Sequence, residues 1–196
     1  ILAQPDRLMI EGMRDHVLLS LLYNSGARIQ EALDLCPKAI RFEAPYCVRL
    51  YGKGRKERIC PLWPETVTLL KKLLERQPRT PDERIFVNRY GEPLGASGVR
   101  YKLAAYVAAA AKTTPTLRSK HVTPHSFRHA TAVHLVAAGV DITVTREPVG
   151  VVGRLPMPIH LLEQEELGLD AGSEGPAPVG QAGGGPLQDL PRAGIE

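Results

Sequence analysis

Cysteines and long apolar runs are both scarce in this sequence, and each shortage excludes a class of protein. The three cysteines, Cys36, Cys47 and Cys60, lack the Cys-x-x-Cys spacing of metal ligands. Their odd number and spacing argue against a disulfide scaffold and favour a reduced intracellular protein. No apolar run reaches membrane-spanning length, and polar residues interrupt the first ten positions, so no signal peptide is recognisable. We therefore expect a soluble protein with no membrane contact.

Clustered carboxylates and late tyrosines are also lacking. The acidic residues do not form a metal-binding pattern, so we expect no metal and no other cofactor. All six tyrosines lie at or before Tyr106. The last 90 residues therefore offer no phenolic hydroxyl.

Charge is distributed unevenly along the chain. Residues 1–147 contain 23 Lys or Arg and 14 Asp or Glu, a net charge of +9, whereas residues 148–196 carry a net charge of −5. The last 49 residues also hold 10 of the 18 glycines and no lysine. A basic surface is expected to meet a polyanion. The change predicts a folded domain over residues 1–147 and an acidic Gly/Pro-rich tail over residues 148–196, largely disordered.

Sequence patterns predict a mainly helical α+β domain with one small β-hairpin. Apolar periodicity and turn residues predict helices over residues 14–23, 27–33, 64–77, 97–112 and 124–136. Alternating β-rich segments predict strands over residues 46–51 and 57–62, and a short strand over residues 85–88. The buried side of the last helix is expected to comprise Phe127, Ala130, Ala132, Val133, Leu135 and Val136.

The stretch around His125 and Arg128 carries the strongest chemical signal. These two residues are three positions apart at the start of a predicted helix, so they share a face near an N-terminus that favours anions. Pro124 suits the entry to that helix. An exposed helical face carrying His and Arg would also explain the pair.

Two further basic segments precede this helix. Arg28 follows the Asn24-Ser25-Gly26 turn and lies in the first turn of a short helix, where a cation is mildly disfavoured unless an anion or solvent is close. Lys53 lies between two glycines at the tip of the predicted hairpin, where the backbone can closely approach a ligand. A solvated turn or a lysine-protected edge strand is the alternative explanation for the hairpin cations.

Taken together, Arg28, Lys53, His125 and Arg128 suit a phosphodiester under attack. Two guanidinium groups can hold the non-bridging oxygens through charge-assisted hydrogen bonds, and a lysine can protonate the departing oxygen. Arginine would then supply the charge neutralisation that a metal supplies elsewhere.

Three ordered segments make the chain resemble the catalytic domain of the tyrosine recombinases, or phage integrases. They are Ser25-Gly26-Ala27-Arg28-Ile29-Gln30-Glu31, Gly52-Lys53-Gly54-Arg55-Lys56-Glu57-Arg58 and Pro124-His125-Ser126-Phe127-Arg128-His129. The resemblance covers roughly residues 10 to 147 and implies a mostly helical domain that embraces duplex DNA without a metal or nucleotide cofactor. It implies site-specific recombination or integration by DNA breakage and rejoining, by a homo-oligomer on DNA in the bacterial cytoplasm, at the nucleoid.

The resemblance also implies a role for each basic residue. Arg28 and Arg128 would clamp the scissile phosphate, Lys53 would protonate the leaving 5′ oxygen, and His125 would assist proton transfer. Further contacts with the DNA are expected from Arg55, Lys56, Arg58, Arg100 and Lys102.

Two features of the family are missing from the C-terminal part. Val151 stands where the resemblance places the histidine of a Leu-Gly-His-like segment, and His160 falls near the position of the tyrosine nucleophile. A frameshift near codons 145–148 is one hypothesis that accounts for this loss, the charge reversal and the glycine enrichment. A genuine divergent tail and a degenerate mobile-element remnant are the alternatives.

We therefore expect a recombinase domain that binds the DNA backbone and does not cleave alone, although an intact partner protomer could supply the tyrosine. A non-catalytic DNA-binding remnant of a mobile element is the second interpretation. A phosphate-binding metabolic enzyme is the third, and it predicts no salt-dependent binding to duplex DNA.

Overall fold

The computed structural model describes residues 1–52, 56–137 and 139 of the chain. The helices are α1 (Ile10–Ser25), α2 (Ile29–Leu33), α3 (Pro64–Arg76), α4 (Ala96–Ala110) and α5 (Pro124–Ala137). Short 3₁₀ helices span Pro37–Ala39 and Pro115–Ser119. The strands are β1 (Ile40–Arg41), β2 (Cys47–Tyr51) and β3 (Glu57–Pro61). The predicted α+β class, mainly helical with a small sheet, is confirmed.

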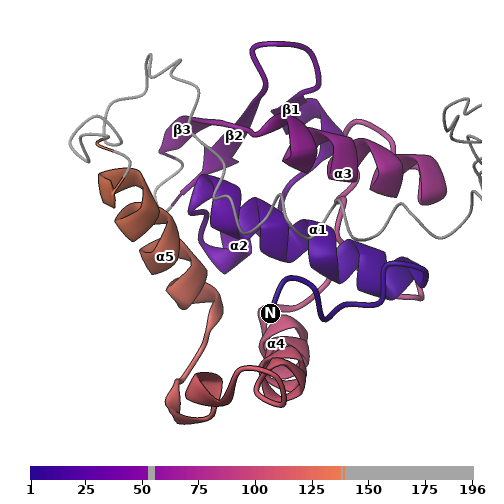
Figure 1. Cartoon of the computed structure of the whole chain (residues 1–196). Helices are drawn as coiled ribbons and strands as arrows, with labels where there is room; N and C mark the ends of the chain where they lie inside the picture. Colours follow the sequence, from indigo (N-terminus) through magenta and orange to yellow (C-terminus); the bar gives the residue numbers. More distant parts are fainter. Residues whose placement is uncertain (53–55, 138, 140–196) are drawn as a thin grey trace, which may run out of the picture.

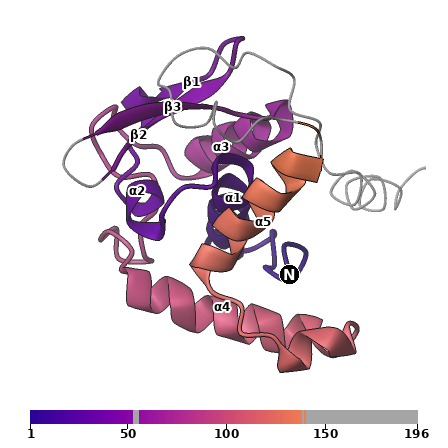
Figure 2. The ribbon, with the colours of Figure 1, turned by 90° about the vertical axis from the view of Figure 1, so that its left-hand side faces the viewer.

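Helix α1 forms the centre of the molecule. The sheet and α3 lie on one side of it, α5 lies alongside, and α4 lies on the other side (Figures 1 and 2). Twelve of its 16 residues are buried, because neighbours cover it on several faces. Its apolar residues, including Leu18, Leu21 and Leu22, belong to the main core cluster. The helix ends where Gly26 adopts a left-handed conformation (φ 57°), as the turn residues predicted.

The strands form an antiparallel sheet in the order β1-β2-β3. In β2, Val48 and Leu50 are buried whereas Arg49 and Tyr51 are exposed, which is the period of two expected for a strand with one face on the core. The predicted hairpin is confirmed, and β1 is an addition that the sequence did not suggest. Between residues 85 and 88 the structure has only an isolated bridge, from Val87 to Pro93, in place of the predicted strand.

The prediction for the buried side of α5 is wrong in part. Phe127 and Thr131 are buried, but Ala130 is exposed and Val133 and Val136 are 54% and 50% exposed. The reason is helical periodicity: α5 packs on α1 through the face of Phe127 and Thr131, and the other three positions lie around the helix from it. Apolar residues occur on more than one face of α5, and the buried face is the one that meets α1.

The expected tail over residues 148–196 lies outside the described residues. So do Val151 and His160, together with the boundary expected near residue 147. Among the residues that the structure describes, no helix is long and apolar enough to cross a membrane.

Candidate functional site

Arg28 occupies the junction between α1 and α2. The left-handed Gly26 ends α1, and the chain restarts as a helix with Arg28 as the N-terminal capping residue of α2. The Arg28 side chain is 59% exposed, yet its Nη1 atom lies 2.9 Å from Oε1 of Glu31. The backbone N–H of Arg28 also donates to Oε2 of Glu31 at 2.9 Å. The anion expected beside this first-turn cation is therefore a carboxylate of the protein, and solvent also reaches the guanidinium.

Arg128 is brought to the same place from the far end of the described chain. Its Nη1 atom donates a hydrogen bond to the carbonyl oxygen of Gly26 at 2.5 Å. One turn later, the Thr131 hydroxyl donates to the carbonyl oxygen of Tyr23 at 2.5 Å. These two bonds attach α5 to the exposed carbonyl groups at the end of α1. The arginine of the third segment thereby becomes a neighbour of the arginine of the first.

Glu31 connects these elements to the hairpin. Its side chain is only 4% exposed, and its Oε2 atom lies 2.6 Å from Nη2 of Arg58 on β3. Burial raises the pKa of this carboxyl, but hydrogen bonds from Arg58 and Arg28 outweigh burial and bring the pKa to about 2. Glu31 is therefore ionised and holds two arginines in place.

The site contains more positive charge than its one buried carboxylate can neutralise. Burial lowers the pKa of Arg128, and the positive charges of Arg58 and Arg28 lower it further. Arg128 is therefore close enough to Arg28 and Arg58 to be repelled by both, where α2, β3 and α5 meet. An arrangement of this kind is stabilised by a bound anion with several oxygens, such as a phosphodiester.

Gly52, just after β2, lies beside this guanidinium cluster. The backbone N–H of Gly52 donates to the carbonyl oxygen of Lys56 at 2.8 Å and closes the turn. A Cβ atom at Gly52 would lie 3.2 Å from Oε1 of Glu31 and 3.7 Å from Nη1 of Arg28, so the glycine permits a close approach. Lys53 and Arg55 themselves lie outside the described residues. Gly52, which directly precedes them, lies against the arginine site.

The remaining predicted residues differ in how available they are. His125 is exposed at the start of α5, one turn before Arg128, and Lys56 and Arg100 are exposed as well. Lys102 is partly committed elsewhere, because its Nζ atom lies 3.0 Å from Oδ2 of the buried Asp15. Arg58, expected on the DNA surface, is half-buried and pairs with Glu31.

Sequence reasoning missed the part played by Glu31. A glutamate three residues after a helix-capping position is the spacing at which a side chain returns to bond the capping N–H, and that signal was available. The pairing with Arg58 was not, since it joins positions 27 residues apart. Among the described residues, no group of three or more His, Cys, Asp or Glu side chains is placed to hold a metal ion.

The fold is a mainly helical domain with a three-stranded sheet, and three of its arginines lie together where α2, β3 and α5 meet. Comparison with known proteins identifies the family. Residues 1–150 match the phage integrase family, and the chain belongs to it. It is 36% identical over 144 residues to y4rC of Sinorhizobium fredii, whose name describes an integrase/recombinase. It is 32% identical over 155 residues to the tyrosine recombinase XerD of Staphylococcus saprophyticus.

Solved structures show the same fold. The XerH site-specific recombinase bound to its difH substrate, in a pre-cleavage complex, superposes with a TM-score of 0.59 at 23% identity, covering 82% of this chain and 48% of that one. The XerA recombinase also gives a TM-score of 0.59, at 20% identity, covering 82% of this chain and 60% of that one. The matches to y4rC and XerD cover 74% and 76% of this chain but 43% and 50% of those proteins. The chain thus spans about half the length of the curated relatives it matches.

Proposed function

We propose that this chain forms the phosphate-holding part of a site-specific tyrosine recombinase or integrase that acts on duplex DNA by strand breakage and rejoining. The observation that carries the proposal is the gathering of Arg28, Arg58 and Arg128 around the buried carboxylate of Glu31, beside Gly52. The three arginines come from segments that are distant in sequence. Their positive charge exceeds the single negative charge of Glu31, and a bound anion would neutralise the remainder.

Each residue has a role in this proposal. Arg28 and Arg128 hold the non-bridging oxygens of the scissile phosphate. Lys53 protonates the departing 5′ oxygen, and His125, one turn before Arg128, assists proton transfer. The charge supplied by arginine removes the need for a metal or another cofactor. Arg55, Lys56 and Arg100 contact the DNA backbone around the site, whereas Lys102 and Arg58 act partly through their internal ion pairs.

The expected domain arrangement is part of the same proposal. Residues 1–147 form the catalytic domain and residues 148–196 an atypical acidic tail that lacks the tyrosine nucleophile. Cleavage then requires a tyrosine from another protomer in a homo-oligomer on DNA. The protein would act in the bacterial cytoplasm, at the nucleoid.

Binding of duplex DNA to Arg28→Ala and Arg128→Ala tests the phosphate site. Each variant is expected to bind a fluorescent duplex about tenfold more weakly than the unmodified chain, since each loses a charge-assisted contact to a phosphate. Arg41→Ala is the matched control, because Arg41 is an exposed arginine on β1 outside the cluster. Equal affinity for all four proteins would show that the cluster does not hold DNA.

A second candidate function is DNA binding without catalysis, favoured by the absence of tyrosine after Tyr106. A covalent protein–DNA adduct that survives denaturing detergent separates the two. It should form when the chain is mixed with a tyrosine-bearing relative on a nicked duplex, and Arg28→Ala in the present chain should reduce it. If the present chain never contributes to adduct formation, the non-catalytic function stands.

A further inference from the structure

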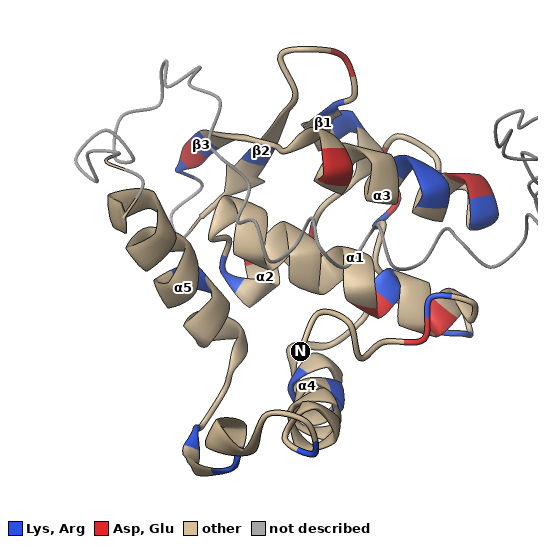
Figure 3. Cartoon of the chain, in the orientation of Figure 1, with Lys and Arg blue, Asp and Glu red and all other residues tan. Residues whose placement is uncertain are grey.

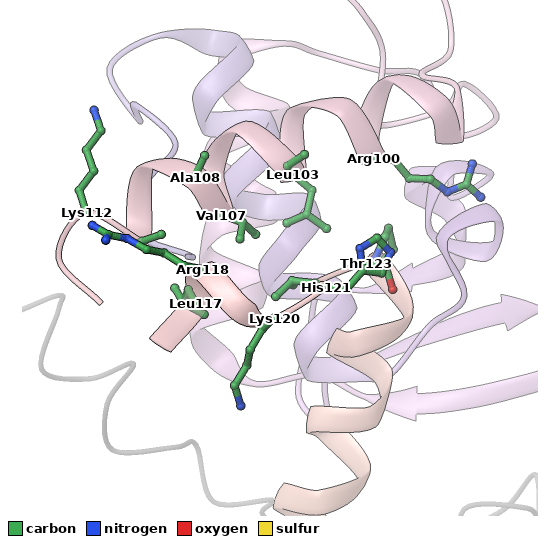
Figure 4. A pocket seen from close by; sticks show the side chains of 14 residues that line it. Arg100, Leu103, Val107, Ala108, Lys112, Leu117, Arg118, Lys120, His121 and Thr123 are labelled. Carbon is green, nitrogen blue, oxygen red and sulfur yellow. The ribbon is translucent and has the colours of Figure 1, made fainter. Parts of the chain in front are cut away.

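A groove separate from the arginine cluster lies between α4 and the segment that leads to α5. It has a volume of about 550 Å³, within the range of sites that hold a small ligand or part of a peptide. The 3₁₀ helix Pro115–Ser119 forms one wall, and the residues just before α5 close the end. Figure 4 shows apolar side chains of α4 and of the 3₁₀ helix facing one another across it.

The groove combines an apolar floor with a basic rim. The floor is formed by Leu103, Val107, Ala111 and Leu117. The rim is formed by Arg100, Lys112, Arg118 and Lys120. No carboxylate lines the groove, and within the described part of the chain none of these four cations belongs to an ion pair. An occupant that complements it must carry apolar groups and several negative charges on a short length.

The C-terminal part of the same chain contains a segment of that composition. Residues 161–170 read Leu-Leu-Glu-Gln-Glu-Glu-Leu-Gly-Leu-Asp, with four leucines and four acids and no basic residue. These ten residues hold four of the seven acidic residues that follow position 147. Their charge of −4 matches the four cations of the rim, and their leucines match its floor. A nucleic acid backbone would satisfy the rim but not the apolar floor.

The chain between the groove and residues 161–170 is long enough for this segment to reach the groove. The groove ends at Pro124, the first residue of α5, and the 14 residues of α5 carry the chain about 20 Å from it. The 23 residues from position 138 to 160 can span up to about 80 Å when extended. A segment tethered at this distance has an effective concentration of about 1 mM, so weak individual contacts are sufficient for occupancy.

We infer that the acidic, leucine-rich segment 161–170 docks in this groove of its own chain. The docking rests on side-chain chemistry and on chain length, and does not depend on the recombinase function proposed above. It covers Arg100, so a docked segment also competes with any polyanion for that side of α4.

Carbodiimide cross-linking of the full chain tests the docking, because it joins a lysine amine to a carboxylate only when the two are in contact. At low protein concentration, without DNA, the monomer should yield peptides linking Lys112 or Lys120 to Glu163, Glu165 or Glu166. Arg118→Glu leaves both lysines in place but reverses one rim charge, and should lower the yield of these peptides about threefold. Arg41→Glu, the same reversal on β1, should leave the yield unchanged.

Three results would overturn the docking. The first is a monomer whose cross-links are spread over surface lysines outside the groove, such as Lys71 and Lys72. The second is linkage of groove lysines mainly to Glu174 or Glu196, which lie in the same tail outside the segment. The third is the groove–segment linkage appearing only in a dimer fraction, which would make a second copy the occupant. Because no DNA is present, none of these results depends on whether the chain binds DNA.

Discussion

The carboxylate of Glu31 both caps α2 and pairs with two arginines. Its Oε2 atom accepts from the backbone N–H of Arg28 and so caps α2, and both oxygens pair with arginines, Oε1 with Arg28 and Oε2 with Arg58. A planar guanidinium bonded to a buried acceptor loses much of its rotational freedom. In the site proposed above, an arginine held in this way is positioned before any ligand arrives, which is the condition for efficient electrostatic stabilisation.

Replacing this carboxylate should destabilise the protein. Glu31→Gln leaves Arg58 and Arg28 without their ionised partner, and we expect the free energy of unfolding to fall by about 2 kcal/mol. The measurement is urea unfolding followed by the fluorescence of Trp63, the single tryptophan, which is buried. Glu57→Gln is the control, since Glu57 pairs with Arg49 in an exposed ion pair on the same hairpin, and should leave the midpoint unchanged. Equal midpoints for both variants would contradict the structural role of Glu31.

The pKa of Glu31 also predicts how stability depends on pH. Its folded-state pKa of about 2 lies below the ordinary value of 4.5, so its ionised form stabilises the folded state above pH 4.5. That stability is lost as pH falls from about 4.5 to about 2, because the folded protein must then take up a proton at a cost. The loss should be about 2 kcal/mol, after allowance for the exposure of Arg28. Unfolding measured from pH 6 to pH 2 should show this loss in the unmodified chain, and a total loss of stability smaller by about 2 kcal/mol in Glu31→Gln.

At the scale of elements, α4 is attached to α1 by a buried polar network. Asp15 accepts from Nε and Nη2 of the buried Arg14 at 2.9 and 2.6 Å, and from the Tyr106 hydroxyl at 2.7 Å. Arg14 also donates to the carbonyl oxygen of Val87 at 2.7 Å, and Lys102 completes the set. Burial and then the bond to Asp15 raise the pKa of Tyr106, so its hydroxyl remains a donor. The network sets the orientation of α4, which carries Arg100 on its outer face.

Removing one hydroxyl tests this attachment. Tyr106→Phe should lower the free energy of unfolding by about 2 kcal/mol, the value of one hydrogen bond to a charged acceptor. Tyr101→Phe is the matched control, because Tyr101 is 80% exposed on the same helix and its loss of a hydroxyl should have no effect. Thermal unfolding by circular dichroism measures both. Equal stability of the two variants would show that the hydrogen bond from Tyr106 to Asp15 does not stabilise the fold.

Local patterns predicted the helices and the hairpin, because turn residues and apolar periodicity act within a few positions of the chain. Gly26 ended α1 as its sequence context indicated, and the strand alternation located β2 and β3. Contacts between distant residues could not be obtained in this way. The bond from Arg128 to Gly26 spans 102 positions, and that from Tyr106 to Asp15 spans 91. The resemblance of three short segments to one family predicted that Arg128 lies close to the first segment. Nothing in the sequence predicted the pairing of Tyr106 with Asp15.

At the scale of the whole molecule, the excess of positive charge over residues 1–147 is spread across several elements (Figure 3). On α3, the basic Lys71, Lys72 and Arg76 are accompanied by Glu65 and Glu75. Lys56 beside the hairpin tip and Arg100 on α4 are exposed and carry no ion pair within the described residues. A surface that neutralises a polyanion needs an excess of positive charge, and on α3 the two glutamates offset most of the charge of the three basic residues.

This distribution predicts a steep salt dependence for DNA binding. If about five cations contact phosphates, affinity for duplex DNA should fall about 10²- to 10³-fold between 50 and 200 mM salt, because each contact releases a counterion. Lys56→Gln combined with Arg100→Gln should reduce the slope of log affinity against log salt by about two. Lys71→Gln combined with Lys72→Gln removes the same charge from α3, and should leave the slope unchanged. Fluorescence anisotropy at five salt concentrations measures the three slopes. Binding that is insensitive to salt would favour a phosphate-binding enzyme over a protein that acts on DNA, whereas equal slopes for the two double variants would place the DNA on a different face of the molecule.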